Sequence, residues 1–111
     1  MRKFGRKINQ RRAFLKGLAV NLILKEKIKT TEVRAKELRS FVERLISYGK
    51  KNNLAGRRNI VSALPLLAAK KLYKEISPRF SQRNGGYTRI IKIGRRLSDG
   101  AKMVFIEIIK E

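Results

Sequence analysis

The stretch Pro-Arg-Phe-Ser-Gln-Arg-Asn-Gly-Gly-Tyr-Thr-Arg-Ile, residues 78–90, separates a mostly helical sequence pattern from a pattern typical of strands. It holds three arginines, two aromatic residues and a glycine pair, and it has no acidic residue. Two glycines let the backbone reach positive φ angles or pass close to a partner, because they have no Cβ atom. The planar guanidinium groups of Arg79, Arg83 and Arg89 suit phosphate oxygens. The stretch therefore predicts a basic binding loop between a helical part and a hairpin.

Two strands are predicted after this loop. Residues 87–94 are rich in β-branched side chains, residues 101–109 are nearly all apolar, and Asp99-Gly100 between them is a turn signal. The connection fits a hairpin whose loop is longer than two residues. Because two strands alone are marginally stable, we expect helices, and an edge strand at residues 27–30, to pack with the hairpin.

Apolar residues recur at helical spacing in the part of the chain before the loop. They predict helices at about residues 10–27, 31–48, 54–63 and 65–77. Thr31 and Asn53 are suited to N-caps. Gly49 is expected just beyond the end of the second helix. Ser77-Pro78 is expected to stop the last helix, because the residue before a proline is disfavoured in the α region.

The length of 111 residues, 42% of them hydrophobic, fits one domain with a modest core. Residues 1–9 carry four cations and few large apolar side chains, so they are expected to form a basic N-terminal arm that orders on nucleic acid. Residues 10–111 are expected to form a single α/β (α+β) domain. In it, about four helices pack on a small sheet that ends in a C-terminal β-hairpin.

Absent residue types exclude several kinds of chemistry. The chain has no cysteine, which excludes disulfides and thiolate metal sites, and no histidine, the usual general base and commonest zinc ligand. No Walker pattern or dinucleotide fingerprint occurs, and no apolar run approaches the roughly 18 residues of a membrane span. We therefore expect no enzymatic activity, cofactor, metal, small-molecule substrate or membrane partner.

The charge predicts an anionic partner, because 29 Lys and Arg stand against 8 Asp and Glu, a net charge of +21. Nine cations lie within residues 1–27 and six within residues 79–96. Two such regions suggest a protein that wraps over folded RNA and neutralises its phosphates. Phe80 and Tyr87 are equally suited to stacking on a base and to anchoring the loop. The candidate RNA-binding residues are Arg2, Lys3, Arg6, Lys7, Arg11, Arg12, Lys16, Arg79, Arg83, Tyr87, Arg89, Arg95 and Arg96.

The run at residues 78–90 resembles the signature of a family of bacterial large-subunit ribosomal proteins, the family numbered seventeen. Three other pieces resemble the same family in the same order. They are Gly5-Arg6-Lys7-Ile8, then Ile28-Lys29-Thr30-Thr31 with Ala35-Lys36-Glu37-Leu38, then Asp99-Gly100-Ala101-Lys102-Met103 with Ile106-Glu107. The resemblance spans nearly the whole chain, and the run at residues 78–90 is its most specific part.

This resemblance implies helices packed on a small sheet, with a basic N-terminal extension. It implies a structural component of the large ribosomal subunit, bound to ribosomal RNA near the polypeptide exit tunnel and beside neighbouring ribosomal proteins. Carried over by position, the implied RNA contacts are Arg2, Lys3, Arg6, Lys7, Arg79, Arg83, Tyr87 and Arg89. The expected location is a cytoplasmic ribosome, and an organellar ribosome also fits. The alternative is a free-standing architectural or regulatory nucleic-acid-binding protein.

Overall fold

One antiparallel sheet of three strands is present in the computed structural model, which describes residues 5–51 and 53–110, with side chains from residue 10 onward. Its strands are β1 (Lys27–Thr31), β2 (Thr88–Arg95) and β3 (Lys102–Ile108). They lie in the order β1-β3-β2, so β3 is central. The predicted hairpin and the predicted edge strand are both confirmed.

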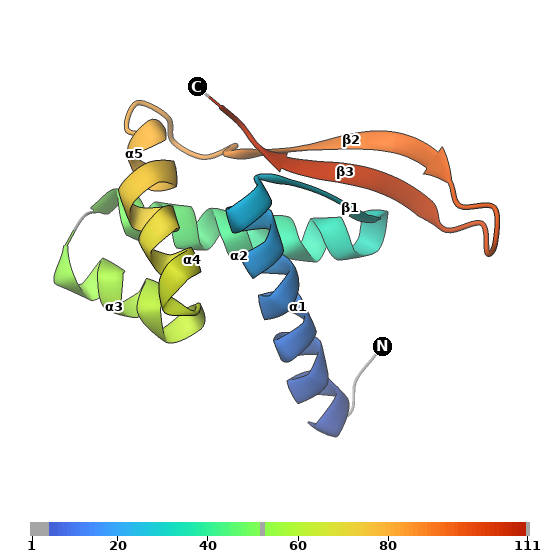
Figure 1. Cartoon of the computed structure of the whole chain (residues 1–111), viewed down its shortest axis with the longest axis horizontal. Coiled ribbons are helices and arrows are strands. Elements are labelled where there is room, and N and C mark those ends of the chain that lie inside the picture. The colour runs from blue at the N-terminus through green and yellow to red at the C-terminus, as the bar shows by residue number, and fades with distance from the viewer. Residues whose placement is uncertain (1–4, 52, 111) are drawn as a thin grey trace.

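Helices cover one face of this sheet (Figure 1). They are α1 (Gly5–Lys25), α2 (Glu32–Lys51), α3 (Leu54–Ala63) and a continuous helical run of α4 (Leu66–Lys71), η1 (Leu72–Ile76) and α5 (Ser77–Arg79). The expected α+β class, with helices on a small sheet that ends in a hairpin, is therefore confirmed. No helix within residues 5–51 and 53–110 is long and apolar enough to cross a membrane.

The core lies between β3 and the helices. Alternate residues of β3, Val104, Ile106 and Ile108, are buried, as the two-residue period of a strand requires. They meet apolar residues of the helices that recur at helical spacing and are also buried, among them Ala19, Leu22, Ile23, Leu38, Val42, Leu45 and Ile46. The opposite face of the sheet is left open by the helices (Figure 1).

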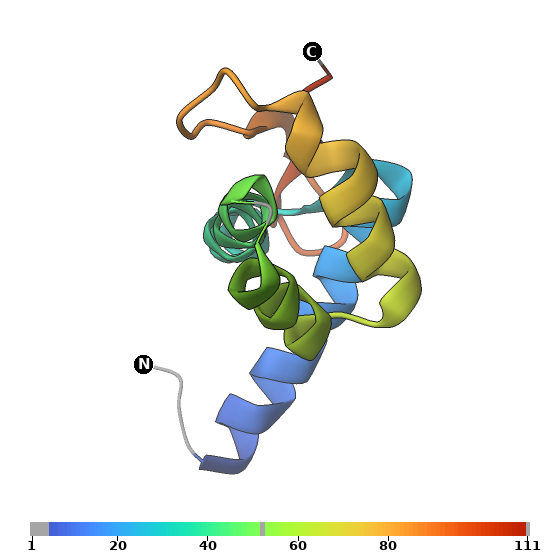
Figure 2. The same ribbon diagram turned by 90° about the vertical axis from the view of Figure 1, so that its left-hand side faces the viewer.

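Helix α1 begins at Gly5, five residues before the predicted start at Gln10. Arginine and lysine favour helices, and residues 6–10 contain no proline or glycine, so the helix continues toward the N-terminus. In two perpendicular views the N-terminal half of α1 projects beyond the other elements (Figures 1 and 2). The side chains of residues 1–9 lie outside the described part, so the division into an arm and a domain stays a prediction.

Local signals for the helix starts are confirmed. Asn53 caps α3, because its Oδ1 accepts a hydrogen bond of 2.7 Å from the Gly56 amide. Thr31 precedes α2, and its Oγ1 accepts a hydrogen bond of 3.4 Å from the Arg34 amide. Both signals depend only on neighbours within three residues, which explains why the sequence pattern sufficed.

The expected end of α2 at Gly49 is wrong, because the helix continues to Lys51. Gly49 is buried inside the helix, where a Cβ atom would lie 2.8 Å from the Cβ of Ser77. Ser77 is fully buried and its hydroxyl donates a 3.1 Å hydrogen bond to the Ile46 carbonyl. Glycine is therefore needed here for close packing of α2 against α5, and not for a helix end.

The expected stop at Ser77-Pro78 is also wrong, because the helical run continues to Arg79. The preceding residues Leu72–Ile76 form a π-helix, in which the Ser77 amide donates to the Leu72 carbonyl. A π-turn relieves the clash that a proline ring makes with a carbonyl of the preceding α-turn. The result is that Arg79 lies at the end of a helix and not within the loop.

We expect Gly49→Ala to destabilise the protein by about 1–2 kcal/mol, because the added methyl group collides with Ser77 and outweighs the better helix propensity of alanine. Gly17→Ala is the matched control in α1, where no atom lies within 4 Å of the added Cβ. It should stabilise the protein by about 0.5–1 kcal/mol. Urea unfolding measures both changes, and equal effects of the two variants would contradict the close-packing role of Gly49.

Candidate nucleic-acid interface

The loop between α5 and β2 contains the glycine pair. Gly85 and Gly86 have φ angles of 103° and 64°, and a Cβ atom on either would have no neighbour within 4 Å. The expectation of positive φ is confirmed. The pair is therefore needed for the backbone conformation of the loop, and nothing in the free protein crowds it.

Tyr87 anchors this loop to the core. The residue is 3% exposed and its ring packs on Phe80, with the ring centroids 5.0 Å apart. Its hydroxyl lies 2.9 Å from Nζ of Lys50, and that ammonium group also donates to the Arg83 carbonyl. Burial would raise the pKa of Tyr87, but hydrogen bonds from Lys50 and Ser47 bring the pKa below its ordinary value. Of the two roles considered for this tyrosine, the structure shows the anchor.

The start of β2 is fixed to α2 by a second polar contact. The carboxylate of Glu43 accepts hydrogen bonds from the amide and the hydroxyl of Thr88, at 3.2 and 2.9 Å. Together with the Lys50 contacts, the Glu43 contact attaches both ends of the segment that contains Gly85 and Gly86 to helix α2. Arg89, which is exposed, and Arg83, which is half-buried, therefore lie on either side of an anchored segment.

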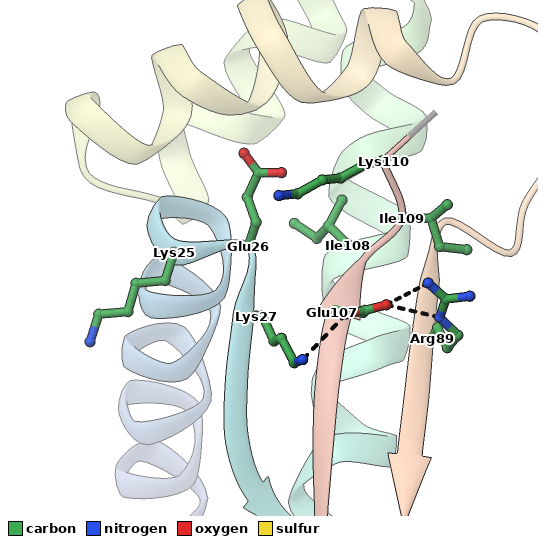
Figure 3. A pocket seen from close by; sticks show the side chains of 8 residues that line it. All are labelled: Lys25, Glu26, Lys27, Arg89, Glu107, Ile108, Ile109 and Lys110. Carbon is green, nitrogen blue, oxygen red and sulfur yellow. Dashed lines mark hydrogen bonds and ion pairs between the residues drawn. The ribbon is translucent and has the colours of Figure 1, made fainter.

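Arg89 lies on the open face of the sheet. Its guanidinium group donates to Glu107 on β3, with distances of 2.9 Å from Nε and 2.5 Å from one terminal nitrogen (Figure 3). Lys27 on β1 lies 4.0 Å from the same carboxylate. The side chain of Arg89 stays 59% exposed, so the guanidinium group can still meet a partner from outside.

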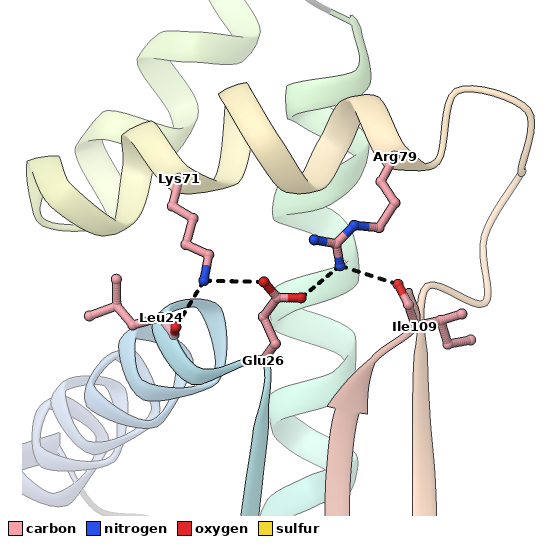
Figure 4. A network of polar contacts seen from close by, with 5 residues as sticks. All are labelled: Leu24, Glu26, Lys71, Arg79 and Ile109. Carbon is pink, nitrogen blue, oxygen red and sulfur yellow. Dashed lines mark hydrogen bonds and ion pairs between the residues drawn. The ribbon is translucent and has the colours of Figure 1, made fainter. Parts of the chain in front are cut away.

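Arg79 is turned toward the interior. Its guanidinium group lies 2.7 Å from a carboxylate oxygen of Glu26 and 3.4 Å from the Ile109 carbonyl (Figure 4). Lys71 approaches the other Glu26 oxygen at 3.2 Å and donates to the Leu24 carbonyl at 2.8 Å. The hydrogen bond from Arg79 holds the pKa of Glu26 below its ordinary value of 4.5, although burial opposes this. Arg79 thus joins the helical run to the α1–β1 junction and to the end of β3.

The tip of the hairpin is basic and exposed. Arg96 makes a two-point contact with Asp99 at 3.0 and 2.8 Å, which lowers the pKa of Asp99 to about 2. Arg95 donates to the Gly100 carbonyl at 2.9 Å. These contacts shape the turn and leave both guanidinium groups at the surface.

The projecting half of α1 carries further exposed cations. Arg12 and Lys16 are exposed, and Arg11 forms a 2.6 Å ion pair with Glu37 of α2. This pair ties α1 to α2. Of the other predicted contacts, Arg2 and Lys3 lie outside the described residues, and the side chains of Arg6 and Lys7 do too.

The candidate residues do not form one cluster. The loop at residues 80–87 and the hairpin tip lie at opposite ends of β2, roughly 23 Å apart for seven residue steps of a strand. The N-terminal half of α1 projects in a third direction (Figure 1). The protein therefore has separate basic projections on one folded body. This arrangement suits a nucleic acid that has several strands around the protein.

Several residues of this region were not predicted, among them Glu26, Lys50 and Lys71. The sequence did contain a signal for Glu26, because it is the single acidic residue among the nine cations of residues 1–27. Lys50 and Lys71 had none, because their partners are 33 to 47 residues away in sequence.

Comparison with known proteins gives a consistent assignment. The family model described as ribosomal protein L17 matches residues 14–109. Large ribosomal subunit protein bL17 of Staphylococcus epidermidis is 50% identical over 119 residues, covering 97% of this chain and 98% of that protein. The bL17 protein of Fusobacterium nucleatum is 50% identical over 109 residues, covering 97% and 94%. The resemblance seen in residues 78–90 is thereby confirmed, and the chain belongs to the ribosomal protein L17 family.

Proposed function

We propose that this protein, by its family a constituent of the large ribosomal subunit, binds and stabilises ribosomal RNA near the polypeptide exit tunnel. The exit-tunnel position rests on the family resemblance. Neighbouring ribosomal proteins are the further partners, and the bacterial relatives favour a cytoplasmic ribosome.

The observation that carries RNA binding is the placement of exposed cations on rigid projections. Arg12 and Lys16 extend on α1, while Arg95 and Arg96 extend on the hairpin. Each neutralised phosphate releases condensed counterions, which favours binding without reading the sequence. Projections in several directions bring separate RNA segments to one body, and their charges reduce the repulsion between those segments.

Sedimentation distinguishes the ribosomal function from the alternative, a free-standing nucleic-acid-binding protein. Extract of cells that express a tagged copy is centrifuged at low magnesium, where the subunits separate. We expect the tagged protein to migrate with the large subunit and to stay there after a wash in moderate salt. Migration at the top of the gradient, or with DNA, would reject the ribosomal function.

A further inference from the structure

A charged hollow of about 340 Å³ lies where the α1–β1 junction meets the end of β3 (Figure 3). Its charged lining consists of Lys25, Lys27, Arg89, Lys110, Glu26 and Glu107. The volume is at the lower end of the roughly 300–1,000 Å³ typical of ligand pockets, but such pockets are mostly apolar. A lining of this kind suits a small charged group and not an apolar ligand.

Both carboxylates of the hollow already have cationic partners. Glu26 is paired with Lys71 and Arg79, which approach it from the helical run (Figure 4). Glu107 stands on the central strand directly opposite Lys27 of β1 and Arg89 of β2. Lys25 points away from both carboxylates (Figure 3), which leaves five cations around them, Lys27, Arg89, Lys110, Lys71 and Arg79. The excess charge attracts an anion.

The backbone corner from which Lys27 leaves is held in a defined geometry. Glu26 has a φ angle of 65°, which turns the chain sharply from α1 into β1, and its carbonyl accepts a 2.9 Å hydrogen bond from the Ile108 amide. A positive φ is unfavourable for glutamate, and the pairing of its carboxylate holds the residue in place. Lys27 therefore follows a chain turn of defined geometry. The side chain of Lys110 extends across the hollow toward Glu26 (Figure 3).

We propose that this hollow binds a phosphate group of ribosomal RNA, with Lys27, Arg89 and Lys110 as its ligands and Glu107 as the internal counter-ion that holds the first two cations in the free protein. The inference rests on the proposed function and adds Lys27 and Lys110 to the interface. Arginine offers a planar fork for phosphate oxygens, while lysine offers a point charge. Glu107 competes with the phosphate for both cations.

The first test removes two ligands. Binding of the full-length protein to protein-free large-subunit rRNA is measured against salt concentration for Lys27→Gln/Lys110→Gln. We expect about tenfold weaker binding near 0.15 M salt and a salt slope reduced by about one unit. The control Lys51→Gln/Lys74→Gln removes two exposed charges from α2 and η1 outside the hollow, and should change affinity less than about threefold. Equal loss in both variants would overturn the phosphate site.

The second test is a substitution that should strengthen rRNA binding. Glu107→Gln should strengthen rRNA binding by about three- to tenfold, because it removes the competing carboxylate. Glu32→Gln removes the same charge from the surface pair with Lys36 and is the control, with little effect expected. Unchanged or weaker binding by folded Glu107→Gln, checked by circular dichroism, would reject the counter-ion role.

A third test distinguishes binding of an RNA phosphate from binding of free phosphate. Inorganic phosphate is titrated into the RNA-free protein, and shifts of the Lys27 and Lys110 amide signals are followed by NMR. Phosphate binding here, combined with an unchanged rRNA affinity of Lys27→Gln/Lys110→Gln, would show a free-anion site and overturn the RNA assignment. If the wild-type protein itself does not bind large-subunit rRNA, the proposed function fails, and not this site alone.

Discussion

Arg79→Ala is expected to lower the free energy of unfolding by about 2–3 kcal/mol, a fall of roughly 10 °C in Tm for a chain of this length. The side chains of Arg79 and Glu26 are only 19% and 16% exposed. Removal of the guanidinium group leaves a half-buried carboxylate with Lys71 as its remaining partner. It also breaks the contact with the Ile109 carbonyl at the end of the sheet.

Arg11→Ala is the matched control for this prediction. Its ion pair with Glu37 has nearly the same length, 2.6 Å against 2.7 Å, but its side chains are 48% and 39% exposed. Exposed pairs contribute about 0–1 kcal/mol, so the loss should be small. If urea unfolding gives equal losses for the two variants, the network around Glu26 is not a structural anchor.

The pH dependence of stability gives a second check on the same network. The pKa of Glu26 is depressed in the folded protein, so its contribution is present above the ordinary value of 4.5 and is lost as the pH falls below it. In Arg79→Ala, this acid-dependent part of the stability should shrink. A variant with the same acid limb as the wild type would contradict the assigned cause of the pKa shift.

Neutralising four projecting cations should weaken rRNA binding by roughly 100-fold near 0.15 M salt. The variant combines Arg12→Gln and Lys16→Gln on α1 with Arg95→Gln and Arg96→Gln at the hairpin tip. Each lost phosphate contact removes about 0.7–0.9 from the salt slope, so the slope should fall by about three units. Filter binding to protein-free large-subunit rRNA across a salt series measures both quantities.

A control variant with the same loss of charge tests whether position matters. Lys51, Arg58, Lys70 and Lys74 are exposed on α2, α3, α4 and η1. Of these elements, α3 and α4 lie at the opposite end of the molecule from the hairpin tip (Figure 1). Replacement of the four residues by glutamine should reduce the affinity by about tenfold or less, through the general field alone. Equal losses would mean that net charge, and not the two projections, determines binding.

Much of the fold was predictable because its signals are local. The strand pattern and the Asp99-Gly100 turn predict the hairpin, and Asn53 predicts the start of α3. The helix ends predicted at Gly49 and Pro78 were wrong, because each residue type is compatible with two different structural roles. Gly49 allows close packing on Ser77, a residue 28 positions later, and Pro78 is accommodated by a π-turn that the apolar pattern does not reveal.

The candidate site was less predictable, for a reason that Arg79 and Arg95 illustrate. Both are arginines in a run without acidic residues, and sequence gives them the same expected role. The fold brings Glu26 to Arg79 from 53 residues away, while Arg95 stays at an exposed tip. Whether a cation meets RNA or a carboxylate depends on such long-range pairing, which composition cannot specify.

A density map of the assembled large ribosomal subunit that contains this protein would show directly whether its projecting cations meet rRNA. We expect rRNA phosphates within hydrogen-bond distance of the cations on α1 and at the hairpin tip, close to the exit tunnel. We also expect a phosphate in the hollow beside Lys27 and Lys110, with Arg79 turned inward to Glu26. A map in which α1 and the hairpin face solvent or protein, with no RNA beside their cations, would contradict the proposed rRNA binding.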